Sequence, residues 1–188
     1  MGRVIVYIAA SLDGFIARPD DDISWLDPFT AGSENYGYAD FIKNVGTAVM
    51  GARTYEQSRI HPERLLAGVK NYVLTRQPLP AAPGIDLELW RGPLTGLAER
   101  IRGESEKDVF IIGGGQVISG FLNEGLVDEI DLFVVPVILE KGIPLFTGIR
   151  KEISLDLIEA RPYSTGIVKL RYAPVPETVK EGLPGIAG

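Results

Sequence analysis

The sequence contains no cysteine, which excludes disulfide bonds, thiolate metal ligands and cysteine nucleophiles. It has one histidine, His61, so a histidine-rich metal site is excluded and any Ser-His-Asp triad would have to use this residue. The polar stretch around His61 predicts a surface or helix-boundary position instead. No apolar run has the length of a transmembrane helix, and no secretory signal precedes the first apolar run. We therefore expect a cytoplasmic protein that does not bind membranes.

Composition and charge narrow the classes further. The chain has 188 residues, of which 45% are hydrophobic, and this is enough for one domain with a substantial core. Its formal net charge of −6 argues against a nucleic-acid-binding surface. We expect a single domain over residues 1–173, followed by a loose tail rich in Pro and Gly over residues 174–188.

The most informative stretch covers residues 109–122 (VFIIGGGQVISGFL). Its first four residues are apolar and predict a buried strand, and three glycines follow at once. The spacing of Val117, Ile118, Phe121 and Leu122 is that of an amphipathic helix. Glycines let a ligand approach the backbone, and the free N–H groups of a helix start attract phosphate, so we interpret this unit as a phosphate-binding turn. It fits neither the Rossmann nor the Walker A pattern, and a tight turn without a ligand is the alternative.

Strand and helix patterns alternate along most of the chain, and strand patterns alone complete it. This order predicts an α/β fold with a mainly parallel central sheet, helices on both faces and a C-terminal antiparallel hairpin. The apolar run 132–139 is expected near a sheet edge, which would be compatible with a homodimer. The expected strands cover residues 3–10, 48–51, 71–75, 85–90, 109–112 and 127–139, the helices 34–45, 53–58, 94–102 and the segment after residue 115, and the hairpin 153–160 and 166–172.

Three of the expected strands end in Gly, Arg or Thr, at residues 51–54, 75–76 and 113–116. Ligands of such sheets bind at the carboxyl ends of the strands, so we expect these three ends to converge on one site. The long loop after the first strand carries Phe15, Trp25 and Phe29. These aromatics predict either a lid over a ligand or anchors that hold the loop to the core.

Together, these blocks resemble a known family. Residues 50–55 (MGARTY), 74–77 (LTRQ) and 111–117 (IIGGGQV) resemble dihydrofolate reductase in their order and spacing. Residues 11–17 (SLDGFIA), 135–136 (VP) and 142–146 (GIPLF) are more similar to the reductase domain of riboflavin biosynthesis, which reduces a ribosylaminopyrimidine phosphate. The resemblance covers about residues 2 to 173 and implies the dihydrofolate reductase-like fold.

The resemblance implies that NADPH is the cofactor. By similarity, residues 113–117 would hold the pyrophosphate, with a cis peptide bond between Gly113 and Gly114. Arg53 and Thr54 would reach phosphate as well. Two arginines on separate loops favour NADPH over NADH, because a guanidinium fork suits a phosphate dianion. The implied cofactor-binding residues are Ile16, Gly51, Arg53, Thr54, Leu74, Thr75, Arg76, Ile112, Gly113, Gly114, Gly115, Gln116 and Val117, of which Thr75 and Arg76 would bind the adenosine 2′-phosphate and Ile16 would close the lid with Phe15 and Trp25.

The sequence departs from dihydrofolate reductases at the helix carboxylate that binds the pterin and supports its protonation. Tyr38 occupies the position of that acid. Glu34, one turn away, and Asp13, in the lid, are the candidate proton sources or substrate anchors. The alternative role for Glu34 is to complement the helix dipole. Dihydrofolate is therefore not the expected substrate, and no metal site is expected.

We therefore predict an NADPH-dependent oxidoreductase that transfers a hydride to a small heterocyclic substrate. A pyrimidine of the 5-amino-6-ribosylaminouracil phosphate type or a pterin-like compound would suit it. A stand-alone reductase is expected, because a zinc deaminase domain requires a Cys-x-x-Cys motif that this chain lacks. One alternative is a non-catalytic nucleotide-binding protein of the same fold. The other is a flavodoxin-like nucleotide-binding protein, and the expected terminal hairpin argues against this second alternative.

Overall fold

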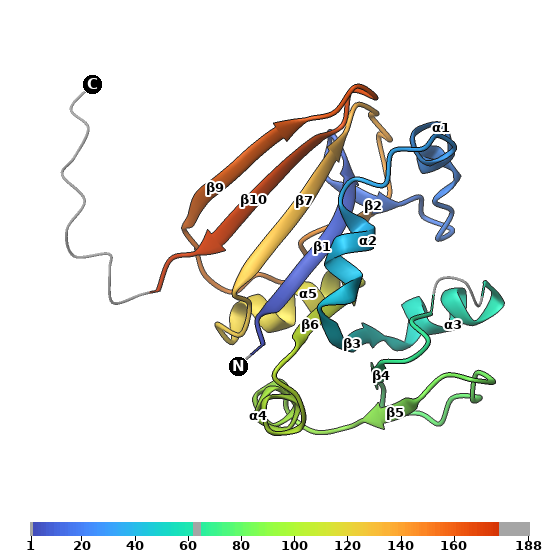
Figure 1. The fold of residues 1–188 in the computed structure, drawn as a ribbon, viewed down its shortest axis with the longest axis vertical. Coiled ribbons are helices and arrows are strands. Elements are labelled where there is room, and N and C mark those ends of the chain that lie inside the picture. Colours follow the sequence, from blue (N-terminus) through green and yellow to red (C-terminus); the bar gives the residue numbers. More distant parts are fainter. Residues whose placement is uncertain (1, 62–64, 177–188) are drawn as a thin grey trace.

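An eight-stranded sheet forms the centre of the molecule, with the strand order β5-β4-β3-β6-β1-β7-β10-β9 (Figure 1). The computed structural model describes residues 2–61 and 65–176. The first six strands in this order, from β5 at the edge to β7, all run parallel. The hairpin formed by β9 and β10 completes the sheet, with β10 antiparallel to β7. The strands are β1 (Val4–Ser11), β3 (Val45–Gly51), β4 (Lys70–Leu74), β5 (Leu87–Trp90), β6 (Asp108–Gly113), β7 (Glu129–Val135), β9 (Leu155–Pro162) and β10 (Val168–Pro174).

Helices cover both faces of the sheet, because the parallel strands are apolar on both sides. Val49 packs on one face, in the cluster that includes residues of α4 (Leu94–Glu104) and α5 (Gly115–Asn123). Its neighbour Met50 points to the other face and packs with Tyr55 of α3 (Ala52–Ile60). The predicted fold class is confirmed. Among the described residues, no helix is long and apolar enough to cross a membrane.

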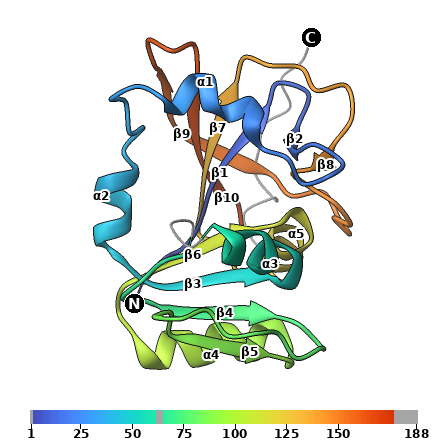
Figure 2. The same ribbon diagram turned by 90° about the vertical axis from the view of Figure 1, so that its right-hand side faces the viewer.

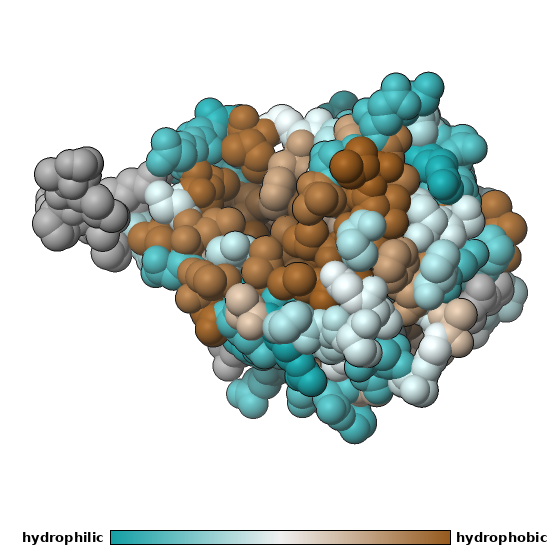
Figure 3. Space-filling view, turned by 90° about the horizontal axis from the view of Figure 1, so that it is seen from above, coloured by the Kyte–Doolittle hydropathy of each residue, from teal (hydrophilic) through white to brown (hydrophobic). Residues whose placement is uncertain are grey.

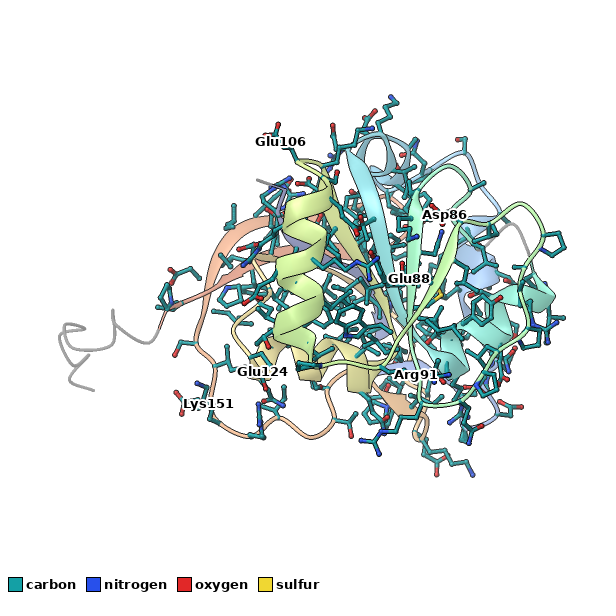
Figure 4. The ribbon with its side chains drawn as sticks, turned by 90° about the horizontal axis from the view of Figure 1, so that it is seen from below. Asp86, Glu88, Arg91, Glu106, Glu124 and Lys151 are labelled. Atoms are coloured by element: carbon teal, nitrogen blue, oxygen red, sulfur yellow. The ribbon has the colours of Figure 1, made fainter. Side chains whose placement is uncertain are left out.

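Ion pairs join the outer strands to helix α4 on the face opposite α3. Arg100 of α4 lies 2.6 Å from Glu88 of β5, and Lys70 of β4 lies 3.3 Å from the same carboxylate. Figure 4 shows Asp86 and Glu88 on strand β5 and the segment before it, beside this helix. These ion pairs lie near the β5 edge of the sheet.

The expected helix over residues 34–45 is much shorter than predicted. Helix α2 covers only Tyr38–Lys43. Tyr36 and Gly37 have φ angles of 56° and 85°, a left-handed conformation that a helix cannot include. The side chain of Asn35 accepts a hydrogen bond from the Gly37 N–H at 2.9 Å, which stabilises this turn. Glu34 therefore lies outside the helix, and the prediction that it lies on the helix face is wrong.

The C-terminal hairpin is confirmed, but the strand expected near an edge is not at an edge. Strand β7 lies between β1 and β10, so the apolar run 132–139 begins in the interior of the sheet. The two edge strands are β5 and β9, and the pairing of β9 with β10 has a register shift between Arg171 and Tyr172. Strand β10 ends at Pro174, and residues 177–188 of the expected tail lie outside the described residues.

The long loop after β1 is held to the core by its aromatic residues. Trp25 lies in the 3-10 turn η1 (Ser24–Leu26), is 5% exposed, and packs with Phe133 and Ile167. Phe29 of α1 (Asp27–Thr30) packs against the same cluster. The expectation that Trp25 closes a lid is therefore wrong, because its indole belongs to the core. A small antiparallel sheet that the sequence did not predict, β2 (Phe15–Ala17) with β8 (Ile143–Pro144), borders this loop.

Candidate functional site

A cleft of about 1110 Å³ opens where strands β3, β4 and β6 end. Figure 2 shows the starts of α3 and α5 and the small sheet β2–β8 on this same side of the molecule. The cleft is lined by these helix starts, by strand β1, by the loop that follows β2 and by residues 142–147. The arrangement places two helix N-termini at one cavity, as expected for an anion-binding site.

The junction between β3 and α3 contributes a cation and a hydroxyl group. Gly51 is the N-cap of α3, and Arg53 and Thr54 lie in the first turn of the helix. A Cβ atom added at Gly114 would lie 3.6 Å from Thr54 Oγ1, so this hydroxyl group faces the start of α5 across the cleft. The side chain of Arg53 is 63% exposed and forms an ion pair with Asp21.

The junction between β6 and α5 contributes backbone groups to the lining of the cleft. The peptide bond between Gly113 and Gly114 is cis, as predicted, and Gly113 has a φ of 117° that favours glycine. Gly115 is required by packing, since a Cβ atom there would lie 2.4 Å from the carbonyl oxygen of Pro144. Helix α5 begins at Gly115, and the first N–H groups of a helix have no acceptor within it. The Val117 N–H already donates to the Gly114 carbonyl at 2.9 Å, so the N–H groups that a ligand in the cleft can use are those of Gly115 and Gln116.

The third strand end reaches the cleft only in part. Leu74 lines it, whereas Thr75 and Arg76 follow just outside, with the Thr75 hydroxyl group accepting a hydrogen bond from Gln77 N–H at 3.1 Å. Gly113 also lies behind the lining. The expected cofactor-binding residues that line the cleft are Ile16, Gly51, Arg53, Thr54, Leu74, Ile112, Gly114, Gly115, Gln116 and Val117.

The structure places Asp13 in a structural role outside the lining of the cleft. Its carboxylate accepts hydrogen bonds from Leu139 N–H at 3.1 Å and Glu140 N–H at 2.8 Å. The Ser11 hydroxyl group donates to it at 2.6 Å and holds the pKa of Asp13 below its usual value. Asp13 therefore joins the turn after β1 to the loop after β7.

Glu34 and Tyr38 also lie outside the lining. Glu34 accepts a hydrogen bond from Tyr36 N–H at 2.9 Å. The ring of Tyr38 lies 5.7 Å from that of Tyr7, and burial raises the pKa of Tyr38. None of the three expected catalytic side chains thus reaches the cleft. Within residues 2–61 and 65–176, no group of three or more His, Asp or Glu is placed to hold a metal.

The structure adds cleft residues that the sequence did not single out. Tyr7 of β1 and Phe110 of β6 line the cleft beside apolar Ile8. Tyr7 stacks on Phe41 at 4.6 Å, and its hydroxyl group donates to the carbonyl of Tyr36 at 3.0 Å. Burial raises the pKa of Tyr7, so it is a neutral phenol.

Asp21 is the other addition. Among the described residues that line the cleft, only Asp21 and Arg53 carry a charge. The sequence shows Asp21 only as one of three consecutive aspartates, so nothing local distinguishes it.

Comparisons with known proteins identify relatives of this chain. The family model of the RibD C-terminal domain matches residues 93–169. The uncharacterized protein YwjB of Bacillus subtilis is 32% identical over 171 residues, covering 90% of this chain and 97% of the relative. The riboflavin biosynthesis protein RibD of Corynebacterium ammoniagenes is 28% identical over 154 residues, which cover 75% of this chain and 45% of that protein.

Solved structures show the same fold. A Shewanella sp. PV-4 protein provisionally assigned to riboflavin biosynthesis matches with a TM-score of 0.82 and 24% identity, over 93% of this chain and 99% of that one. Dihydrofolate reductase of Enterococcus faecalis, in complex with NADP(H), matches with a TM-score of 0.64 and 16% identity, over 92% and 96% of the two chains. This chain therefore belongs to the RibD C-terminal domain family, which is reductase-like, and it has the dihydrofolate reductase fold.

Proposed function

We propose that this protein is an NADPH-dependent reductase that acts on a small heterocyclic substrate in the cytoplasm. The observation that carries the proposal is the convergence of Arg53, Thr54 and the N-terminus of α5 on one cleft. A cation, a hydroxyl group and free backbone N–H groups are the donors that a pyrophosphate group requires. Membership of a reductase-like family supports the same assignment.

The donor set fits NADPH along its length. Arg53, Thr54 and the first turn of α5 would hold the pyrophosphate, and Thr75 and Arg76, just beyond Leu74, would meet the adenosine 2′-phosphate. When bound, NADPH supplies a hydride. The residues of this chain orient the two reactants and exclude water, for which the apolar lining of the cleft is suited.

The substrate that we propose is a pyrimidine, of the 5-amino-6-ribosylaminouracil phosphate type, or a pterin-like heterocycle. The aromatic rings of Tyr7 and Phe110 in the lining suit a flat ring. A helix carboxylate for protonating dihydrofolate has no counterpart among the described cleft residues, since Asp21 belongs to the loop after β2. Dihydrofolate itself is therefore not the substrate that we propose.

Calorimetric titration with NADPH and NADH tests the cofactor. We expect tighter binding of NADPH, and we expect Arg53→Gln to weaken it about tenfold through loss of a charge-assisted hydrogen bond. Arg59→Gln, in the exposed last turn of the same helix, is the matched control and should leave the affinity unchanged. Failure of the wild type to bind either nucleotide at millimolar concentration would contradict the proposal. Binding of NADPH without oxidation by any pyrimidine or pterin would favour a non-catalytic nucleotide-binding protein.

We further propose a homodimer, through a different strand from the one first expected. Edge strand β9 exposes Leu157 (57%) and Ile158 (56%) beside unpaired backbone groups, and a second copy could pair with it about a two-fold axis. Figure 3 shows apolar residues spread across this end of the molecule, including the side of the hairpin. Light scattering should give twice the mass of one chain, and a monomer mass would contradict the dimer.

A further inference from the structure

The guanidinium group of Arg53 is already occupied by a carboxylate of the same chain. Arg53 Nε lies 2.7 and 2.8 Å from the two carboxylate oxygens of Asp21. Arg53 Nη2 also donates to the carbonyl oxygen of Pro19 at 3.3 Å. All three residues line the cleft. The cation that suits a ligand phosphate is therefore engaged by the loop between β2 and η1.

This loop presents Asp21 without help from Arg53. Asp21 has a φ of 69° and donates its N–H to the carbonyl of Arg18 at 3.0 Å, and Arg18 N–H donates to the carbonyl of Asp22 at 2.9 Å. The guanidinium group of Arg18 pairs with the Asp22 carboxylate and donates to the Ser24 hydroxyl group at 3.2 Å. The turn is thus closed by its own contacts. The Asp21 side chain is only 18% exposed, whereas that of Arg53 is 63% exposed.

We propose that Asp21 is an internal substitute for the phosphate of the ligand, and that it sets the affinity of the cleft for anions. Carboxylate and phosphate accept from the same guanidinium fork, and two anions beside one cation repel each other. A phosphate group that takes the Nε edge of Arg53 must therefore displace Asp21, and one that binds the other edge is held beside the Asp21 charge and repelled by it. The inference rests on the proposed function for the identity of the ligand, and on the Asp21–Arg53 contact for the competition.

The displacement requires only a small part of the chain to move. Strand β2 ends at Ala17 and η1 begins at Ser24, so the loop between them has two fixed ends. Two charged neighbours of Asp21 in this loop, Arg18 and Asp22, are paired with each other. Release of Arg53 therefore leaves the turn intact and exposes the guanidinium group to the cleft.

Asp21→Asn tests the competition, because asparagine keeps the shape and tolerates the positive φ while removing the charge. Calorimetry would measure the dissociation constants of NADPH and, separately, of inorganic pyrophosphate. We expect both to bind roughly three- to tenfold more tightly to Asp21→Asn, as for removal of one partly exposed ion pair and one repulsive charge. Asp20→Asn makes the same change in net charge on an exposed neighbour, and should leave both constants unchanged.

The outcomes separate this inference from the proposed function. Equal or weaker NADPH binding to Asp21→Asn overturns the inference and leaves the reductase proposal standing; weaker binding would show that the pair closes over the cofactor. Tighter pyrophosphate binding without any NADPH binding supports the role of Asp21 and removes the proposed cofactor. Failure of both probes to bind either protein overturns both.

Discussion

Two of the carboxylate–cation sites in the molecule use the same chemistry in opposite ways. Asp131 of β7 has a side chain that is 2% exposed, and it contacts two cations: Arg171 at 2.7 and 2.8 Å and Lys169 at 2.9 Å. Asp21 contacts a single cation, Arg53, whose side chain is 63% exposed. The first pair lies within the sheet between β7 and β10, and the second lies across the mouth of a cleft.

The difference shows when an ion pair stabilises the fold and when one of its partners can be replaced by another anion. Asp131 is desolvated and held on both oxygens, so removing it takes away the nearest carboxylate of both cations and leaves Arg171 with Glu129 at 3.2 Å and Lys169 with Glu159 at 3.8 Å. Arg53 remains in contact with water, and another anion can take the place of Asp21 at little cost. Burial and the number of partners, more than the distance between charges, decide which role a pair has.

The largest effect should come from breaking the buried site. Asp131→Asn is expected to lower the free energy of unfolding by about 3–5 kcal/mol, because buried Lys169 loses its one close carboxylate and Arg171 keeps only Glu129. Urea unfolding followed by circular dichroism would measure the loss. Glu159→Gln, whose carboxylate is 38% exposed and 3.8 Å from Lys169, is the control and should cost less than about 1 kcal/mol. Equal losses for the two variants would remove the distinction that burial makes.

Acid should reduce stability through the same buried site. Burial alone would raise the pKa of Asp131, but the hydrogen bonds and charges of Arg171 and Lys169 outweigh it and hold the pKa below the usual 3.8. The stabilisation is therefore fully present above the unfolded pKa and is lost as pH falls through the lower folded pKa. Urea unfolding of wild type and Asp131→Asn, measured from about pH 6 to about pH 2, should show their difference shrinking on the acid side. A difference independent of pH would show that the charge of Asp131 does not contribute.

The smallest effect on stability should come from the site at the cleft. Asp21→Asn is expected to change the free energy of unfolding by less than about 0.5 kcal/mol, because its partner is solvated. The same urea experiment measures it. A loss comparable to that of Asp131→Asn would mean that the loop depends on Arg53 for its structure, and the two sites would then be alike.

Much of the fold could be predicted from the sequence because its signals are local. The apolar runs and glycine turns placed the strands and the three strand ends, whereas the cis peptide bond at Gly113 was implied by the family resemblance alone. The errors arise where long-range contacts decide. Trp25 is buried by Phe133 and Ile167, more than a hundred residues away in the chain, and the interior position of β7 depends on how the hairpin docks.

The site shows the same limit. Ten of the thirteen expected cofactor-binding residues line the cleft, and all of these except Ile16 lie at or just after strand ends that the sequence marks. Asp13, an expected acid, instead caps backbone N–H groups 126 and 127 residues away. Asp21 and Arg53 are 32 residues apart and meet only in the folded chain, so no spacing rule connects them.

The close packing at Gly115 fixes one wall of the cleft. With the Pro144 carbonyl oxygen where a Cβ would otherwise be, and Leu145 N–H bonded to the Gly14 carbonyl at 2.9 Å, helix α5, strand β8 and the turn before β2 form one rigid wall. The short turn that carries Asp21 forms another part of the cleft lining. Substitutions at exposed positions of the Asp21 turn would therefore change the charge and shape of the cleft while leaving the packed contact at Gly115 untouched.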